Sequence, residues 1–383
     1  MPKINMNHAA TSASKPVEVI ESALAYLQAN SHQSSGRGGD ELESASVVFD
    51  ARISVAEFFK ASHPSRVVFT SGATESINMA IHGLVREGCH VLATSMEHNA
   101  VARPLHLLWQ QGKIDLTWLP CGSDGSFDPS CITSALRENT RLLVMTHASN
   151  VVGNVLPIEE TFALAKQHGL WTILDAAQSV GHREVTLGTH TDVIAFTGHK
   201  ALRGLAGSGG LVLSRSAEKE MSVWKAGGTG SHSHELDMPL FYPDRLEAGT
   251  PNTLGIIALK AAVEAISRQG FDAIIAHERA LTSRFVDGIL QLPLCMYGHY
   301  DADNWVPLVS LNHPRLDAGV IAKDLQHEYG IATRSGLHCA PLAHRSLGTY
   351  PQGTLRFSFG VDTTFHEIDA TLNALSRICA GQR

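Results

Sequence analysis

Two charged residues follow apolar segments near the middle of this 383-residue sequence. Asp175 ends the segment LWTILD, and Lys200 comes three residues after the segment DVIAFT. A carboxylate at the end of a buried strand is costly unless it meets a cation or several hydrogen-bond donors. Two arrangements meet this need: a buried ion pair between Asp175 and Lys200, or a ligand that lies between them.

A third polar segment, VVFTSGATESIN, leads from an expected strand into an expected helix through residues 71–74. The first turn of a helix offers free N–H groups and the positive end of the helix dipole, which suit an anion such as phosphate. Ser and Thr at such a turn are as often plain N-caps. This segment alone therefore fits a cap and a phosphate site equally well.

Pyridoxal phosphate is a ligand that needs all three groups at once. A lysine amine forms an imine with its aldehyde, a carboxylate keeps its pyridine nitrogen protonated, and an anion cradle holds its phosphate. Two more strand-end residues suit the same site. His98 can lie flat on the ring, and Asn150 can reach a substrate or ring oxygen. Together these groups predict a pyridoxal phosphate site.

The elements that would position these residues alternate in type from about residue 66 to 214. Short segments rich in β-branched residues alternate with helical patterns. This alternation predicts an α/β fold of right-handed β-α-β units, with a mainly parallel sheet covered by helices. Ligands of such folds bind at the carboxyl ends of the strands, which is where the residues named above occur.

Helical patterns and further strands flank this region. The helix expected at PVEVIESALAYLQAN places four apolar residues on one face: Val17, Ile20, Leu24 and Leu27. After about residue 252, two long helical patterns and the strand candidates VPLVSLN, GIATRS and TLRFSFG predict a smaller α+β domain. We place the large domain at residues 14–255 and the small domain at residues 1–13 and 256–383.

Composition excludes several classes of function. The net charge is −7, and no lysine or arginine run indicates a nucleic-acid or anionic membrane surface. No apolar stretch approaches the roughly 18 residues of a membrane span, and the first residues lack a signal-peptide pattern. We therefore expect a cytoplasmic protein that binds neither nucleic acid nor membrane.

The cysteines and one histidine-rich loop give no metal-binding pattern. The six cysteines are scattered without a C-x-x-C pair, which is typical of free thiols in a reducing compartment. The segment GSHSHE holds His232, His234 and Glu235, but alternate residues in a loop lack the usual spacing of metal ligands. No metal site is predicted.

Several motifs resemble those of a known family, the class V (fold type I) pyridoxal-phosphate enzymes, and within it the cysteine desulfurases. The matching pieces, in family order, are TSGATESIN, MEHN, THASNVVG, DAAQSVGH, TGHK, EAGTPN, RSGLHC and LRFSFG. They extend from about residue 66 to 360. The resemblance implies a large domain with a seven-stranded, mainly parallel sheet and a homodimer.

The resemblance also implies roles for individual residues. Lys200 would bind the cofactor covalently, Asp175 would pair with its ring nitrogen, Gln178 would meet its ring hydroxyl, and His98 would stack on the ring. Other cofactor-binding residues would be Asn150 and a phosphate-binding set, with Thr250 contributed by the other subunit: Ala73, Thr74, Thr197, His199 and Thr250. Thr197 stands where many relatives have serine, which keeps the hydroxyl.

The C-terminal motifs imply how the substrate is held and attacked. Arg356 can grip an amino-acid carboxylate with two parallel hydrogen bonds, and the resemblance adds Asn150 and Arg334 to the substrate-binding residues. Cys339 follows Gly336 and stands beside His338, where a nearby cation or imidazolium would raise its thiolate fraction. The segment RSGLHC resembles desulfurases with a short cysteine loop, which often work with a separate sulfur-acceptor protein.

The implied reaction converts L-cysteine to L-alanine and leaves the sulfur on Cys339 as a persulfide. Four alternatives remain open from the sequence. They are a selenocysteine lyase that acts on L-selenocysteine, a β-elimination lyase, an aminotransferase, and a non-catalytic scaffold in sulfur delivery. Lys200, Asp175 and Arg356 argue against the scaffold, because an idle site has no physical reason to keep buried charges.

Overall fold

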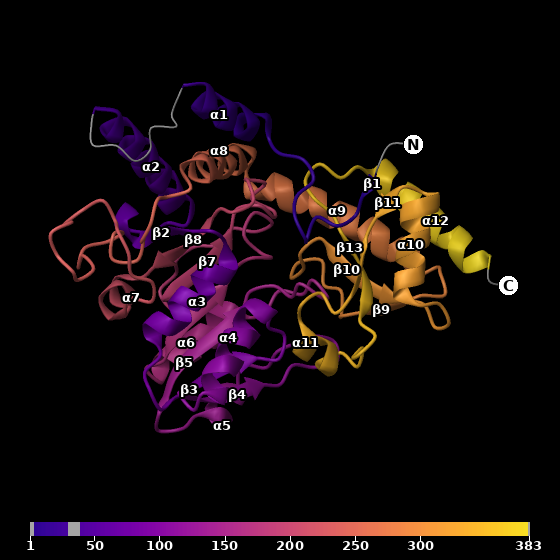
Figure 1. The fold of residues 1–383 in the computed structure, drawn as a ribbon. Helices are drawn as coiled ribbons and strands as arrows, with labels where there is room; N and C mark the ends of the chain where they lie inside the picture. Colours follow the sequence, from indigo (N-terminus) through magenta and orange to yellow (C-terminus); the bar gives the residue numbers. More distant parts are fainter. Residues whose placement is uncertain (1–3, 30–38, 382–383) are drawn as a thin grey trace.

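The computed structural model describes residues 4–29 and 39–381, which form two larger sheets and one two-stranded sheet, with helices packed on them (Figure 1). The larger sheet has seven strands in the order β2-β8-β7-β6-β5-β3-β4. Its strands are β2 (Val67–Thr70), β3 (Cys89–Thr94), β4 (Ile114–Leu119), β5 (Thr140–Thr146), β6 (Trp171–Asp175), β7 (Val193–Thr197) and β8 (Gly209–Leu213). Strand β8 runs antiparallel to both of its neighbours, β2 and β7, and the other neighbouring pairs of this sheet are parallel. The predicted mainly parallel sheet is confirmed.

Both faces of this sheet are covered, which explains why its central strands are continuously apolar. Along β5, Leu142 and Val144 belong to one hydrophobic core and Leu143 to the other, as the alternation of a strand requires. The helices that follow the sheet strands are α3 (Ala73–Leu84), α4 (Asn99–Gln110), α5 (Cys131–Ala135), α6 (Ile158–Gln167) and α7 (Arg215–Glu220). Helices α3 and α4 pack on one face and α6 on the other.

A second, antiparallel sheet has the order β12-β13-β10-β9. Its strands are β9 (Cys295–Tyr297), β10 (Leu308–Asn312), β12 (Arg334–Gly336) and β13 (Thr354–Ser358). Their apolar residues share a core with three helices: α9 (Phe271–Ile289), α10 (Ala318–Glu328) and α12 (Phe365–Ala380). The short strand β1 (Ile4–Asn5) pairs in parallel with β11 (Ile331–Ala332), so the start of the chain joins this part of the molecule.

The remaining helices lie around these two sheets. They are α1 (Val17–Gln28), α2 (Gly39–Phe58), the 3-10 helix at Pro64–Arg66, α8 (Thr253–Gln269) and α11 (Pro341–Ser346). Both α1 and α2 pack against α8 in the upper part of Figure 1. None of the helices in the described ranges is long and apolar enough to cross a membrane.

The packing of α1 differs from what its sequence pattern favours. The four apolar residues on its predicted face are 50–60% exposed: Val17, Ile20, Leu24 and Leu27. Val19, on another side of the helix, is buried against three alanines of α8. A smooth alanine surface admits close approach of the helices and needs only one small apolar side chain from α1. The larger apolar face therefore points away from this chain.

A glycine contact fixes where β8 begins relative to the turn that precedes α3. A Cβ atom at Gly209 would lie 2.6 Å from the Cα of Gly72 and 2.6 Å from the carbonyl oxygen of Phe196. Both are backbone atoms of neighbouring segments and cannot rotate away. Only glycine permits this approach.

We expect Gly209→Ala to lower the free energy of unfolding by about 1–3 kcal/mol, the usual cost of forcing an extra methyl group into packed structure. Urea denaturation measures this change in the free energy of unfolding. The matched control is Gly228→Ala, because a Cβ there meets no atom within 4 Å. Equal unfolding midpoints for the two variants would contradict the contact.

Candidate active site

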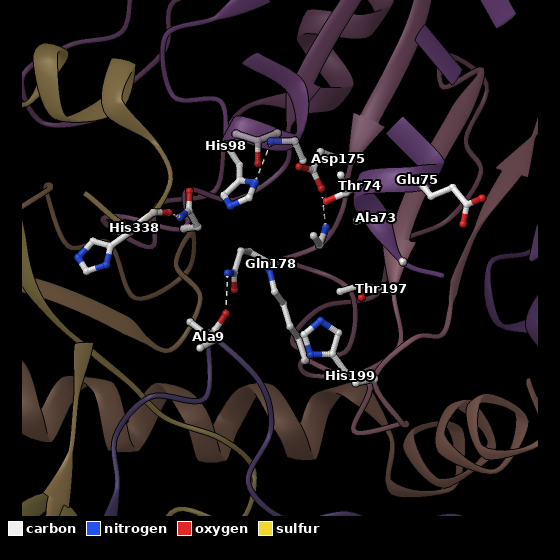
Figure 2. Close-up of a pocket in the computed structure, with 18 of the residues that line it drawn as sticks. Ala9, Ala73, Thr74, Glu75, His98, Asp175, Gln178, Thr197, His199 and His338 are labelled. Carbon is white, nitrogen blue, oxygen red and sulfur yellow. Dashed lines mark hydrogen bonds between the residues drawn. The ribbon is translucent and has the colours of Figure 1, made fainter. Parts of the chain in front are cut away.

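A cavity of about 320 Å³ opens at the carboxyl ends of the central strands (Figure 2). The structure brings most of the predicted site residues to its walls: Ala73, Thr74, His98, Asn150, Asp175, Gln178, Thr197, His199, Lys200, Arg334 and Arg356. They come from both sheets and from the connections between them. The two predicted residues that do not line this cavity are Thr250 and Cys339.

One end of the cavity is built from the turn at residues 71–74, which leads into α3. Gly72 has a φ of 147°, and a Cβ atom there would lie 3.3 Å from the Thr197 hydroxyl, so glycine keeps this corner open. Burial, and then Lys200, lowers the pKa of the nearby His199 to about 4, so its ring is neutral. Its Nδ1 lies 3.1 Å from the Thr11 hydroxyl. Backbone N–H groups and hydroxyls thus face a space suited to a phosphate.

Asp175 is a buried carboxylate, 3% exposed, at the end of β6. Its Oδ1 accepts a hydrogen bond of 2.9 Å from the backbone N–H of Ala177. Burial raises its pKa, while the Ala177 bond and the positive charge of Lys200 oppose that shift. Gln178 stands close by and donates from Nε2 to the carbonyl oxygen of Ala9 at 3.0 Å. The carboxylate is therefore available to a cationic group in the cavity.

Lys200 lies where the loop after β7 enters the cavity, and burial lowers its pKa to about 8. Asp175 opposes this shift, and the guanidinium groups of Arg356 and Arg334 add to it. Among the described residues, no ion pair within 4.0 Å joins Lys200 to Asp175. The ion-pair alternative is thus absent from the geometry, and the two side chains face a common space instead.

His98 caps the N-terminus of α4. Its Nδ1 accepts a hydrogen bond of 3.0 Å from the backbone N–H of Ala100. Burial, helped by the nearby cations Lys200 and Arg334, lowers its pKa to about 4, so the ring is neutral. Figure 2 shows His98, Asp175 and Gln178 pointing into the same space. A neutral ring fixed at one nitrogen is suited to stacking on a flat ligand.

Arg356 is 2% exposed on β13, and burial lowers its pKa to about 9. Its Nη1 donates to the Asn150 carbonyl oxygen at 2.8 Å, and its Nη2 donates to Oδ1 of Asn7 at 3.3 Å. Its Nε has no hydrogen-bond partner, and no carboxylate forms an ion pair with it within the described ranges. A buried cation that lacks an anion is suited to bind a substrate carboxylate.

Cys339 is exposed and stands beside the cavity on the segment after β12. Its Sγ lies 3.9 Å from Nη2 of Arg334. Its backbone is left-handed, with a φ of 58°, and its carbonyl oxygen accepts a hydrogen bond of 2.7 Å from Asn99. Asn150 holds the preceding residue by donating from Nδ2 to the His338 carbonyl oxygen at 2.7 Å.

The cation beside this thiol is Arg334, and an imidazolium at His338 is ruled out. Burial, followed by the charge of Arg356, lowers the pKa of His338 to about 2. Its Nε2 lies 3.1 Å from both the carbonyl and hydroxyl oxygens of Thr354. The His338 ring is therefore neutral and directed into the second sheet, and it anchors the cysteine segment.

Thr250 lines a neighbouring cavity of about 270 Å³. The two cavities share Ser71, Glu75 and Gly207 in their walls. Thr250 itself is exposed and lies outside the first cavity of its own chain. This position leaves open a role in the site of a second subunit.

Several lining residues were missed from the sequence. Ala9 and Ala10 reach the cavity from the start of the chain, and no charge or periodicity in NHAAT marks them. Thr146 ends β5 as Asp175 ends β6, so the rule that located Asp175 also applies to it. Glu75 lines the cavity in the first turn of α3 and forms an ion pair of 2.8 Å with Lys225.

The histidine-rich loop lies at the surface. His232 and His234 approach the same carboxylate oxygen of Glu235, at 3.3 and 3.5 Å. In the part of the chain that the structure describes, no group of three or more His, Cys, Asp or Glu is arranged to hold a metal ion.

Comparison with known proteins gives the family. The sequence pattern named aminotransferase class-V matches residues 4–371. The chain belongs to the class V aminotransferase family. A cysteine desulfurase of Pectobacterium carotovorum is 32% identical over 380 residues, covering 96% of this chain and 91% of that protein. A cysteine desulfurase of Salmonella agona is 31% identical with 96% and 92% coverage.

Two solved structures share the fold. The apo cysteine desulfurase of Thermococcus onnurineus has a TM-score of 0.92 and 29% identity, and covers 99% of this chain and 95% of its own. The cysteine desulfurase CsdA of Escherichia coli, in an S-sulfonic acid form, has a TM-score of 0.88 and 27% identity, with 98% and 94% coverage. The resemblance stated from the motifs is therefore confirmed.

Enzymes of this family use pyridoxal phosphate, and the cavity fits that cofactor. The turn at residues 71–74 offers donors for the phosphate, and Asp175 offers a carboxylate without an ion-pair partner in the described ranges. The neutral ring of His98 faces the same space, and Lys200 supplies an amine with a lowered pKa. The turn at residues 71–74 would hold the phosphate of the cofactor. Asp175 and His98 would hold its ring, and Lys200 would bind its aldehyde.

The lowered pKa of Lys200 predicts how the apoprotein captures its cofactor. Only the neutral amine attacks an aldehyde, so the capture rate is expected to rise with pH up to about 8 and to level off above it. Stopped-flow absorbance after mixing with pyridoxal phosphate measures the rate. Lys200→Ala is the control and should not develop the visible absorbance. A rate that keeps rising toward the ordinary lysine value of 10.5 would contradict the lowered pKa.

Proposed function

We propose that this protein is a cysteine desulfurase that converts L-cysteine to L-alanine and transfers the sulfur to Cys339. The observation that carries the proposal is the exposed Cys339 thiol beside Arg334, at the edge of a cavity that holds Lys200 and Arg356. The naming of both curated relatives and both solved structures as cysteine desulfurases supports it.

The cavity residues have separate tasks in this reaction. Arg356 binds the carboxylate of L-cysteine, because its free Nε and cationic charge lack an anion among the described residues. When bound, pyridoxal phosphate supplies an electron sink for the substrate α-carbon. Lys200 then moves the α-proton, since its lowered pKa makes proton exchange accessible near neutral pH.

Cys339 accepts the sulfur. Its thiolate attacks the substrate sulfur, an S–S bond forms, and the Cβ–S bond breaks. Cβ gains a proton, so L-cysteine and the Cys339 thiol give L-alanine and a Cys339 persulfide, with no external oxidant or reductant. The guanidinium of Arg334 lies 3.9 Å from this sulfur.

The other candidate reactions have less support. A selenocysteine lyase would use the same cavity with less need for the thiol. A β-elimination lyase or an aminotransferase would have no use for a cysteine beside a guanidinium. A scaffold would have no reason to bury Lys200, Asp175 and Arg356 around one cavity.

We also propose a cytoplasmic homodimer in which Thr250 completes the phosphate site of the other subunit. Thr250 is exposed and lies next to the cavity without lining it. The exposed apolar face of α1 and three exposed apolar residues of the segment 236–241 give surface for association: Leu236, Leu240 and Phe241.

A separate protein with an acidic surface is the proposed sulfur acceptor. Residues 331–352, which carry Cys339, contain no Asp or Glu, although the whole chain has 37. Exposed Arg345 lies on the same segment, and exposed Arg103 lies one helical turn from Asn99, which bonds the Cys339 backbone. An acceptor thiol would take the outer persulfide sulfur and return Cys339 as a thiolate.

Cys339→Ala tests the reaction. The variant is expected to bind pyridoxal phosphate normally but to lose alanine formation by roughly a hundredfold or more, because water is a poor sulfur acceptor. Alanine and persulfide are measured together. Cys295→Ala removes another exposed cysteine and should keep full activity. Partial activity of Cys339→Ala on L-selenocysteine fits a better leaving group, whereas full turnover of L-cysteine to pyruvate and ammonia would establish a β-elimination lyase.

Thr250→Val tests the dimer and is expected to weaken cofactor affinity about tenfold, since a hydrogen bond to a charged group is lost. Mixed dimers sharpen the test. Combining Lys200→Ala subunits with Thr250→Val subunits rebuilds one complete site only if Thr250 acts across the interface. Recovery of activity on mixing is expected. Failure of the mixed dimers to recover activity, or a fully active monomer by light scattering, would refute the shared site.

A further inference from the structure

Glu97 carries a buried carboxyl group that the proposed reaction does not use. Its side chain is 0% exposed, between β3 and α4 and directly before His98. Its Oε1 accepts hydrogen bonds from the Thr94 hydroxyl and, at 2.9 Å, from the backbone N–H of Thr146. Its Oε2 has no partner among the described residues. One oxygen of a wholly buried acid is therefore unsatisfied.

This acid lies close to the carboxylate proposed to meet the cofactor. Thr146 is the last residue of β5 and pairs in register with Asp175 of β6, and both line the cavity. The charge of Asp175 acts on Glu97 directly. Two carboxylates in one buried region repel each other, so both are not ionised together without a cation for each.

Among the described residues, the groups around Glu97 provide no cation paired with it. Among the residues that the structure describes, Asp175 acts on Glu97, and Glu97 acts on Cys121. Burial raises the pKa of the Cys121 thiol to about 11, so it is neutral. The adjacent His98 ring is neutral as well, and Lys200 acts on Asp175. In the described ranges no ion pair reaches Glu97.

Burial therefore decides the charge of Glu97. An ionised group would place an unpaired charged oxygen in the interior, whereas a protonated group leaves only an unpaired O–H. Burial raises the pKa of Glu97 to about 8; the hydrogen bonds from Thr94 and Thr146 oppose this shift, and Asp175 adds to it.

We propose that Glu97 works as a neutral acid, which holds the end of β5 through Thr146 and leaves Asp175 as the single negative charge facing the cofactor ring. Glu97 does not line the cavity, so it is a positioning residue that acts through Thr146 and Asp175. The inference rests on the proposed pyridoxal phosphate site and adds a residue that protects its charge balance.

Glu97→Gln tests the charge. The amide keeps the size of the side chain and an oxygen for the bonds from Thr94 and Thr146, and it is neutral at every pH. At neutral pH we expect the variant to bind pyridoxal phosphate within about threefold of wild type. Glu97→Ala also loses the bonds and should bind about tenfold more weakly or worse. A tenfold loss in Glu97→Gln would show that the negative charge is needed and would overturn the proposal.

Unfolding gives a readout independent of activity. Folded Glu97 keeps its proton up to about pH 8, whereas the unfolded residue loses it near the ordinary value of 4.5. Folding therefore becomes less favourable from about pH 5 to about pH 8 in wild type, and Glu97→Gln lacks this loss. The urea midpoint of Glu97→Gln relative to wild type is expected to rise over that range, in holoenzyme and apoprotein.

The control is Glu138→Gln, whose exposed side chain lies on the loop before β5. Its midpoint relative to wild type should stay constant with pH. A constant relative midpoint for Glu97→Gln would mean that Glu97 is ionised in the folded protein, and the proposal would fail. Failure of wild type to bind pyridoxal phosphate would instead refute the proposed function, while the apoprotein series would still report the charge of Glu97.

Discussion

The arrangement of this molecule depends on buried charges that lack ion-pair partners in the described part of the chain. Asp175, Lys200 and Arg356 face one cavity, and the burial that shifts the pKa of each is costly for a charged group. Such charges persist only where rigid surroundings fix their positions and a bound ligand supplies the opposite charge. The two sheets supply that rigidity, because Asp175 ends β6, Arg356 lies within β13, and Lys200 follows the end of β7 by three residues.

The site also ties the two sheets together. Arg356 of the second sheet donates to the Asn150 carbonyl oxygen after β5, and the Asn150 side chain donates back to His338. The start of the chain adds a third connection, since Gln178 bonds the carbonyl oxygen of Ala9, while β1 pairs with β11. The residues proposed to bind substrate thus also fix the distance between the two halves of the cavity, so binding and alignment of the two sheets are coupled.

The strand-end residues could be predicted from sequence because the rule behind them is local. A polar residue that follows an apolar strand of a parallel sheet lies at the end of that strand, where ligands bind. This rule located Asp175, Asn150 and the turn before α3. The edge strands β4 and β9 were not predicted, because their residues are only partly buried and their sequences therefore lack a continuous apolar pattern. The exposed face of α1 could not be predicted, since periodicity marks an apolar face but does not say which surface covers it.

The environment of Cys339 shows most clearly where sequence reasoning ends. The sequence left open a nearby cation or an imidazolium as the group beside the thiol. Left-handed backbone at His338 and Cys339 directs the two side chains to opposite environments: His338 is 3% exposed and Cys339 is exposed. The cation comes instead from Arg334, across the segment. A thiol that takes sulfur from a bound substrate and passes it to the proposed acceptor has to stand at the cavity edge. The bonds from Asn99 and Asn150 hold the uncommon backbone in that position, so the geometry that exposes Cys339 also keeps His338 neutral and buried.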